Sequence, residues 1–239
     1  MTSSPEPASP PAGTTVAILL AAGSSTRMGG EDKLWVDLGG APLIAYALNT
    51  LAAIEEIDAL VVVAPAERHA ELDRLGVTAG RQVICVEGGA RRRDSVRAGI
   101  QAAPAAAWYL VHDGARPLVS AGLATRLLQA ARARTSDGAA VPGLPVVDTV
   151  KRVDAAGVVL ETLPRGELRT IQTPQAFAGD LLRRAHALDD ADATDDAVLV
   201  ERLGAPVQVI AGEPANIKVT TARDLAQVRA LVALGSLAD

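Results

Sequence analysis

Short runs of valine, isoleucine and leucine alternate along this 239-residue chain with longer, alanine-rich amphipathic stretches. Such alternation is typical of repeated strand–helix units, in which helices cover both faces of a parallel sheet. The strands are expected at Val16–Leu20, Ala59–Val63, Gln82–Val86, Ala107–Val111, Gly138–Pro142 and Pro206–Ile210. The helices are expected at Pro42–Ala53, Glu67–Leu75, Arg92–Ala102, Ala121–Arg134, Gly179–Leu188, Asp195–Leu203 and Ala222–Leu234. The pattern predicts an α/β fold of three layers with a mostly parallel central sheet.

One segment interrupts this alternation. In DTVKRVDAAGVVLETLPRGELRTIQTPQ, residues 148–175, valine and threonine alternate with charged residues on both sides of DAAG. This pattern predicts a β-hairpin with a tight turn near Ala155–Gly157. A charged hairpin is poorly covered by its own domain. We therefore expect an arm at about residues 146–170 that projects from the main sheet and packs against a second copy of the chain.

Composition limits the partners of this chain. A net charge of −5 and only five aromatic residues (2 Trp, 2 Tyr and 1 Phe) argue against a nucleic-acid partner. No apolar stretch approaches the roughly 20 residues of a membrane span, so no membrane partner is expected. The proline-rich residues 1–13 predict a disordered tail before a single domain at 14–239. The one cysteine, Cys85, excludes an internal disulfide and fits a cytoplasmic location.

The first predicted strand runs into an unusual loop. The stretch LLAAGSSTRMGGEDK, residues 19–33, passes from apolar residues into small residues and glycines, and carries Arg27 and Lys33. Backbone amides at a glycine-rich turn after a parallel strand commonly hold phosphates. The stretch matches neither the dinucleotide fingerprint nor a P-loop. It is therefore either an anion-binding loop or a solvated loop with incidental charges.

A carboxylate follows another predicted strand. In WYLVHDGARPLV, the apolar residues end in His112 and Asp113 beside a tight turn. A carboxylate there is suited to hold a divalent cation or a hydroxyl group, although Asp113 alone is also a common turn former. Neighbouring strand residues point in opposite directions, so His112 should not share a ligand with Asp113. We expect structural or surface roles for His112, His69 and His186.

A third stretch, EGGARRRDSVRAGI, places paired glycines before a helix. Gly88 and Gly89 permit close backbone approach to a flat ligand, and Ser95 is positioned to bond a base edge. Of the three consecutive arginines, at least two are expected on a solvated helix face.

Three further polar residues lie at the ends of predicted elements. Thr173 and Thr194 are usual capping residues, whereas Lys218 adds a cation between two apolar residues at an expected strand end.

Taken in this order, the motifs resemble the 2-C-methyl-D-erythritol 4-phosphate cytidylyltransferases of the nucleotidyltransferase superfamily. The resemblance covers residues 15–235 and rests on LAAGSSTRMG…DK, GGARRRDSV, VHDGARP, PVVDTVKR, TPQAF, TDDA and NIKVT. It implies a Rossmann-like three-layer domain with a projecting arm. It also implies transfer of CMP from CTP to a polyol phosphate, with release of pyrophosphate, in isoprenoid precursor synthesis by the non-mevalonate route.

The resemblance also implies roles for individual residues. The catalytic residues would be Arg27, Lys33, Arg165 and Lys218. The nucleotide would contact Ala21, Ala22, Gly23, Ser24, Ser25, Gly89, Ser95 and Asp113. The polyol phosphate would contact Asp113, Arg116, Thr149, Arg165, Thr173, Thr194 and Lys218. Mg²⁺ would be held mainly by the CTP phosphates, with Asp113 as a further ligand, and the arm would reach into the partner's site of a homodimer.

Two departures from the family pattern and two alternatives stay open. Ser25 and Thr26 stand where relatives often carry glycine and a basic residue, and Leu34 replaces a common glutamine. A ribitol 5-phosphate cytidylyltransferase would share most of these motifs. A non-catalytic nucleotide-binding regulator would not need Arg27, Lys33, Asp113 and Lys218 together.

Overall fold

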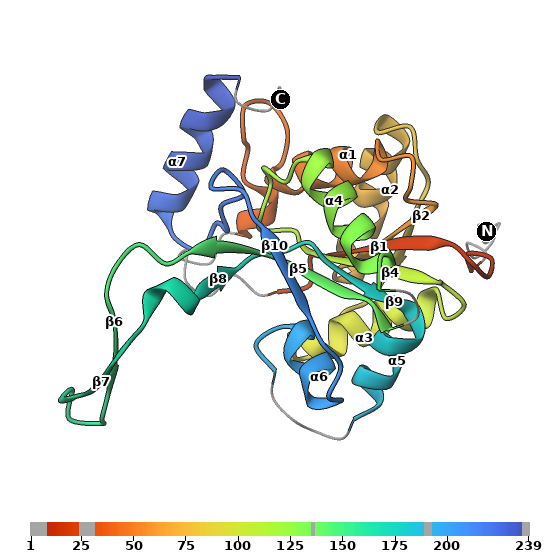
Figure 1. Cartoon of the computed structure of the whole chain (residues 1–239). Coiled ribbons are helices and arrows are strands. Elements are labelled where there is room, and N and C mark those ends of the chain that lie inside the picture. The colour runs from red at the N-terminus through yellow and green to blue at the C-terminus, as the bar shows by residue number, and fades with distance from the viewer. Residues whose placement is uncertain (1–8, 24–31, 135–136, 189–192, 236–239) are drawn as a thin grey trace.

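An eight-stranded, mostly parallel sheet forms the centre of the molecule (Figure 1). The computed structural model describes residues 9–23, 32–134, 137–188 and 193–235. The strands of this sheet are β1 (Thr15–Leu20), β2 (Ala59–Val63), β3 (Val83–Val86), β4 (Trp108–Asp113), β5 (Ala139–Pro145), β8 (Arg169–Ile171), β9 (Gln175–Ala178) and β10 (Gln208–Ala211). Their order is β10-β5-β9-β4-β1-β2-β3, with β8 paired to β5. The six predicted strands are confirmed, with shifts of a few residues at their ends.

Two strands of the sheet escaped the sequence prediction. β9 lies antiparallel between β4 and β5, and β8 lies antiparallel to β5. β9 has only four residues, all buried, so it shows no alternation that a sequence pattern would reveal. Its Phe177 is fully buried and lies opposite Tyr109. β9 therefore completes the core beside β4.

Helices cover both faces of the sheet, as predicted. One face carries α1 (Leu43–Ala52), α2 (His69–Thr78), α4 (Ala121–Arg132) and α7 (Ala222–Ala233). The other carries α3 (Arg92–Ala102), α5 (Gly179–Ala187) and α6 (Asp196–Arg202). Alternate residues of one strand serve the two layers: Leu19 packs into the first core cluster and Ile18 into the second. Burial on both sides explains why the strands are continuously apolar in sequence.

The predicted arm is a separate two-stranded sheet, formed by β6 (Val150–Val153) and β7 (Val159–Leu163). Its turn contains Gly157 at φ +82°, a left-handed conformation that favours glycine. A short 3-10 helix, η4 (Arg165–Glu167), leads back toward the body. Figure 1 shows the arm standing away from the three layers. Residues 169–171 pair with β5, so the chain has already rejoined the main sheet there.

The tail prediction concerns residues 1–13, of which residues 1–8 lie outside the described residues. Within the rest, Pro10 is buried and the Gly13 amide donates to the Ala105 carbonyl at 3.4 Å. Over the described part of the chain, no helix has the length and apolarity needed to cross a membrane.

Candidate active site

Two adjoining pockets open at the carboxyl ends of the parallel strands. The larger, of about 760 Å³, is lined by the segments that follow β1, β3 and β4, together with Lys33. The smaller, of about 390 Å³, lies among β5, β8, β9, β10 and α6. Arg92, Asp113 and Lys218 line both pockets. Ligands of open α/β sheets bind at this edge, so two ligands held here would meet at these three side chains.

The structure brings most of the described predicted residues to the pockets. The larger pocket is lined by Ala22, Gly23, Lys33, Gly89, Ser95, Asp113 and Lys218. The smaller is lined by Asp113, Arg116, Thr173, Thr194 and Lys218. Ser24, Ser25 and Arg27 lie outside the described residues.

Three predicted residues are placed differently. Ala21 is buried, and its amide donates to the Val63 carbonyl at 2.7 Å, so this amide continues the sheet and does not face a ligand. The prediction needs correction there, because strand pairing extends one residue beyond β1. Thr149 and Arg165 are exposed on the arm and are not part of the lining of either pocket in their own chain.

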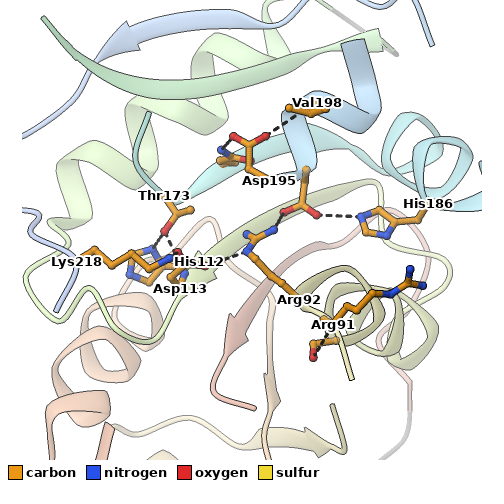
Figure 2. Close-up of polar contacts among 12 residues, drawn as sticks. Arg91, Arg92, His112, Asp113, Thr173, His186, Asp195, Val198 and Lys218 are labelled. Carbon is orange, nitrogen blue, oxygen red and sulfur yellow. Dashed lines mark hydrogen bonds and ion pairs between the residues drawn. The ribbon is translucent and has the colours of Figure 1, made fainter. Parts of the chain in front are cut away.

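A chain of alternating charges crosses the site (Figure 2). Lys218 Nζ lies 2.7 Å from Asp113 Oδ2, and Asp113 Oδ1 accepts from Arg92 Nε at 3.2 Å. Arg92 Nη1 donates to Asp196 Oδ2 at 2.8 Å, and His186 Nε2 lies 3.0 Å from Asp196 Oδ1. Both oxygens of each carboxylate are therefore held.

Three of these charged residues lie at the end of a strand or the start of a helix. Asp113 is the last residue of β4, and Arg92 and Asp196 are the first residues of α3 and α6. Lys218 is 105 residues from Asp113 in sequence, but the Val219 amide donates to the Ala115 carbonyl at 2.8 Å and fixes the lysine's segment beside β4.

The charges hold Asp113 ionised. Burial of its carboxylate raises the pKa, but the charges of Arg92 and Lys218 outweigh burial, and the net pKa lies well below its usual range. The pKa of Arg92 is raised: burial opposes its charge, while Asp196 and Asp113 stabilise it. Burial lowers the pKa of Arg116. The site therefore presents charged groups across the neutral pH range.

His112 supports Asp113 through Thr173. His112 Nε2 lies 3.0 Å from the Arg116 carbonyl, which can only accept, so Nε2 carries the proton. The Thr173 hydroxyl accepts from the Asp113 amide at 3.0 Å and donates to His112 Nδ1 at 3.1 Å. Thr173 thus lines the smaller pocket with its hydroxyl already engaged, and His112 has the structural role that the sequence indicated.

The three consecutive arginines correct the sequence prediction. Only Arg91 is solvated, where it pairs with Asp94. Arg92 bridges two carboxylates, and Arg93, only 9% exposed, donates to the carbonyls of His186 and Leu188. The expectation of at least two solvated arginines is wrong, because the inner face of α3 already includes positions 92 and 93. Arg92 and Arg93 precede buried Val96 by four and three residues, and Ile100 follows it by four. This helical spacing would have predicted that both arginines face inward.

The paired glycines pack against their neighbours. A Cβ atom on Gly88 would lie 2.2 Å from the Ala22 side chain, and one on Gly89 would lie 2.3 Å from that of Asp94. The Gly89 amide donates to Ser95 Oγ at 3.2 Å. Glycine at both positions lets the loops after β1 and β3 close one wall of the larger pocket.

Lys33 begins a short 3-10 helix, η1 (Lys33–Trp35). The Asp32 side chain accepts from the Leu34 amide at 3.2 Å and caps this helix. Leu34 is 3% exposed and belongs to the core, and the Arg68 guanidinium lies 4.4 Å from the Trp35 ring centroid. An apolar residue at position 34 therefore anchors the segment that carries Lys33.

Sequence reasoning missed several polar residues beneath the site. Arg92 and Asp196 belong to the charge chain, and fully buried Asn216 donates to the Thr173 carbonyl at 2.8 Å. Gln172 Nε2 donates to the carbonyls of Glu213 and Asn216. Such long-range contacts leave no periodic trace in the sequence.

The donor set offers little to a metal ion beyond one carboxylate. Among the residues that the structure describes, no three His, Cys, Asp or Glu side chains group together. Burial and neighbouring Asp73 raise the pKa of the Cys85 thiol to about 12, which keeps it protonated and inert. The Asp113 carboxylate lines both pockets, and carboxylate oxygens are suited to a divalent cation.

A parallel sheet with glycine-lined loops and several cations at its carboxyl edge defines an α/β protein that binds phosphorylated ligands. The sequence model of the family "2-C-methyl-D-erythritol 4-phosphate cytidylyltransferase" matches residues 15–233. The chain belongs to this family and is therefore a nucleotidyltransferase.

Relatives and solved structures that are similar to this chain carry the names of the same family. The 2-C-methyl-D-erythritol 4-phosphate cytidylyltransferase of Nocardia farcinica (strain IFM 10152) is 49% identical over 214 residues, 89% of this chain and 91% of the relative. That of Rhodococcus jostii (strain RHA1) is 44% identical over 94% of this chain and 97% of the relative. The crystal structure of the Thermus thermophilus cytidylyltransferase is 36% identical, with a TM-score of 0.73 over 90% of this chain and 98% of that one. The Anaerococcus prevotii 4-diphosphocytidyl-2C-methyl-D-erythritol synthase gives a TM-score of 0.81 at 29% identity, over 92% of this chain and 99% of that one.

Burial of His112 predicts a pH-dependent stability. Burial lowers the pKa of His112 from 6.5 to about 4 in the folded chain. Between these values the unfolded chain takes up a proton and the folded chain does not, so the free energy of unfolding falls as pH falls. His112 alone should remove about 2 kcal/mol between pH 7 and pH 5.

Urea unfolding at these two pH values checks this prediction. In His112→Gln the fall in stability should be smaller by that amount, because the other titrating groups are unchanged. Asp113 does not contribute to the fall between pH 7 and pH 5. Its pKa is lowered in the folded chain, so its contribution to stability is lost only as the pH drops below about 3.8, the ordinary pKa of an aspartate. Equal falls in the two proteins would contradict the assignment.

Proposed function

We propose that the two pockets hold CTP and 2-C-methyl-D-erythritol 4-phosphate, and that the enzyme joins them into 4-diphosphocytidyl-2-C-methyl-D-erythritol with release of pyrophosphate. The observation that carries this proposal is the shared wall of Arg92, Asp113 and Lys218. A shared wall lets a phosphate from each pocket approach the other. Such positioning accounts for a large part of catalysis when two substrates react.

The reaction needs no general base. A phosphate oxygen of the polyol phosphate is already ionised near neutral pH and attacks the α-phosphorus of CTP in line. The bond from this phosphorus to the bridging oxygen breaks, and pyrophosphate leaves with the electron pair. The protein's task is to orient both phosphates and to offset charge in the transition state. Lys33 and Lys218, which line the larger pocket, suit the leaving pyrophosphate and the attacking phosphate respectively.

The larger pocket suits the nucleotide. Gly89 and Ser95 would border the cytosine, and the backbone at Ala22 and Gly23 would face the triphosphate. The Ser95 hydroxyl accepts from the Gly89 amide, so it orders the loop that a base would contact. The smaller pocket, with Arg116 and Thr194 on its walls, would take the polyol phosphate.

A divalent cation, in our proposal Mg²⁺, would be held by the CTP phosphates and Asp113. When bound, it would offset phosphate charge. Arg92 and Lys218 keep the Asp113 carboxylate ionised and oriented for this role. We also propose that the enzyme works in the cytoplasm, which fits its single free cysteine.

We propose a homodimer in which each arm completes the partner's site. The arm exposes apolar side chains that its own chain leaves uncovered, including Val158 at 60% and Leu160 at 62% exposure. Exposed apolar patches of this kind are typical of protein interfaces. Thr149 and Arg165 lie on the same arm, away from their own pockets, and would contact the polyol phosphate in the other subunit.

The substrate assignment predicts an order of activities. With CTP and Mg²⁺, pyrophosphate release should be fastest with 2-C-methyl-D-erythritol 4-phosphate, slower with ribitol 5-phosphate and absent with a hexose 1-phosphate. A coupled pyrophosphate assay measures this order. A preference for ribitol 5-phosphate would indicate a ribitol 5-phosphate cytidylyltransferase. Nucleotide binding without turnover on any acceptor would indicate a non-catalytic regulator.

Lys33→Ala should lower kcat by about a hundredfold, because a cation beside the leaving pyrophosphate acts most strongly in the transition state. The KM for CTP should change much less. Steady-state kinetics measure both, with Arg184→Ala as a control that removes an exposed arginine paired to Asp137. Unchanged kcat in Lys33→Ala would remove this residue from the mechanism.

The arm proposal predicts complementation between damaged subunits. Arg165→Ala should chiefly weaken binding of the polyol phosphate, and Lys218→Ala should lower turnover. Co-refolding the two variants should restore about a quarter of wild-type activity, because half of randomly paired dimers are mixed and each has one intact site. Light scattering should give twice the 24.5 kDa mass of one chain. No recovery from proven mixed dimers would show that each arm serves its own site.

A further inference from the structure

The charge chain continues beyond the pockets, into a part of the molecule that the proposed reaction does not use. Arg92 lines both pockets, whereas Asp196 and His186 are not part of the lining of either. Asp196 is 1% exposed and His186 is 3% exposed. Two buried polar side chains behind a site residue call for a structural reason.

Asp196 has no local role that would explain its burial. Its neighbour Asp195 is the N-cap of α6: the Asp195 carboxylate accepts from the Val198 amide at 3.1 Å and from Gln175 Nε2 at 2.8 Å. The Asp196 carboxylate instead accepts from Arg92 Nη1 at 2.8 Å. Helix capping is therefore satisfied without Asp196.

The two carboxylates fix the guanidinium of Arg92 from both sides. Nε donates to Asp113 and Nη1 donates to Asp196, so the planar group is tied at two different nitrogens. Among the described residues, Arg92 Nη2 is buried without a hydrogen-bond partner. An arginine released from Asp196 would turn to bind Asp113 with two N–H groups, because a fork is its preferred contact with a carboxylate.

Such a turn would disturb Lys218. Asp113 has two oxygens, and at present one serves Arg92 and the other serves Lys218. If Arg92 took both oxygens, it would compete with Lys218 for the carboxylate and shift the lysine's contact at the point where the two pockets meet. Asp196 therefore limits Arg92 to one oxygen and leaves the second for Lys218.

We propose that Asp196, oriented by His186, is a positioning residue that acts through Arg92 to keep Asp113 shared between Arg92 and Lys218. The inference rests on the proposed function of the two pockets. Neither residue touches a reacting group. The pair forms an anchor from α5 and α6, which pack on the same face of the sheet as α3.

The test is the kinetics of Asp196→Asn, which keeps the shape of the side chain and removes its charge. CMP transfer should show kcat lowered by about tenfold, because small misplacement at a reacting centre is costly. The KM for CTP should stay within about twofold, since the nucleotide pocket itself is intact.

A double-variant cycle separates positioning from general weakening of the fold. In an Arg92→Lys background, which lacks the planar group whose separate nitrogens hold the two carboxylates, Asp196→Asn should add less than about twofold. His186→Ala should lower kcat in the same direction, and His186→Gln, which keeps a donor, should recover most of it. Arg93→Ala is the control: it removes a more deeply buried arginine of α3, which donates to the backbone carbonyls of His186 and Leu188 and, among the described residues, to neither the Asp196 nor the His186 side chain. This control should lower the urea midpoint and leave kcat within about twofold of wild type.

Each outcome decides one point. If the wild-type protein transfers no CMP, the proposed function fails. If the wild type is active and Asp196→Asn keeps its kcat, or if the effects of Asp196→Asn and Arg92→Lys multiply, only the positioning role fails. If Asp196→Asn does not fold, the contrast between His186→Ala and His186→Gln decides, and equal kcat in those two variants overturns the role.

Discussion

Asp113 is an ionised carboxylate with 11% of its side chain exposed, and its two oxygens are divided between Arg92 and Lys218. A buried carboxylate without partners would be protonated or would destabilise the fold. The pairing therefore constrains more than one residue. It requires the start of α3, the end of β4 and the segment before α7 to meet at one point, which is also where the two pockets join.

The sheet order makes this meeting possible. β4 lies beside β1, so Asp113 stands next to the loop after β1. α3, which follows β3 in the chain, brings its first residue, Arg92, to the same carboxylate. The antiparallel strand β9 enters directly beside β4 and delivers Thr173 to the Asp113 amide. A purely parallel sheet would not place the residues before β9 at this edge. β9, one of the two reversed strands among the described residues, thus supports the backbone of the central carboxylate.

The sequence predicted the framework and both residues of one important contact, that between Asp113 and Lys218. Continuous apolar strands, amphipathic helices and the hairpin around Gly157 have local patterns, and each was found in place. Asp113 was found because a polar residue at a strand end stands out against apolar neighbours. Lys218 was found because it lies between two apolar residues, but the strand end expected there is wrong, since residues 216–220 form no strand. At least two of the arginines at 91–93 were expected in solvent because charge alone was weighed, although the register of α3 places both Arg92 and Arg93 inward. Asp196 was read only as part of a helix start, since its partner lies 104 residues away.

The charges at the centre of the site cancel, so the site needs further cations to bind phosphorylated substrates. Arg92 and Lys218 are matched by Asp113 and Asp196, so these four side chains together carry no net charge. Two phosphorylated substrates bring several negative charges into the same space, and their transition state concentrates charge further. Additional cations must then come from elsewhere: Lys33 lines the larger pocket and Arg116 the smaller, and the proposed divalent ion and partner arm would add to them. The balanced group mainly sets geometry, with Lys218 as its member nearest the proposed attacking phosphate, and the surrounding cations supply most of the attraction. Separating these two tasks lets the site hold its shape whether or not the substrates are bound.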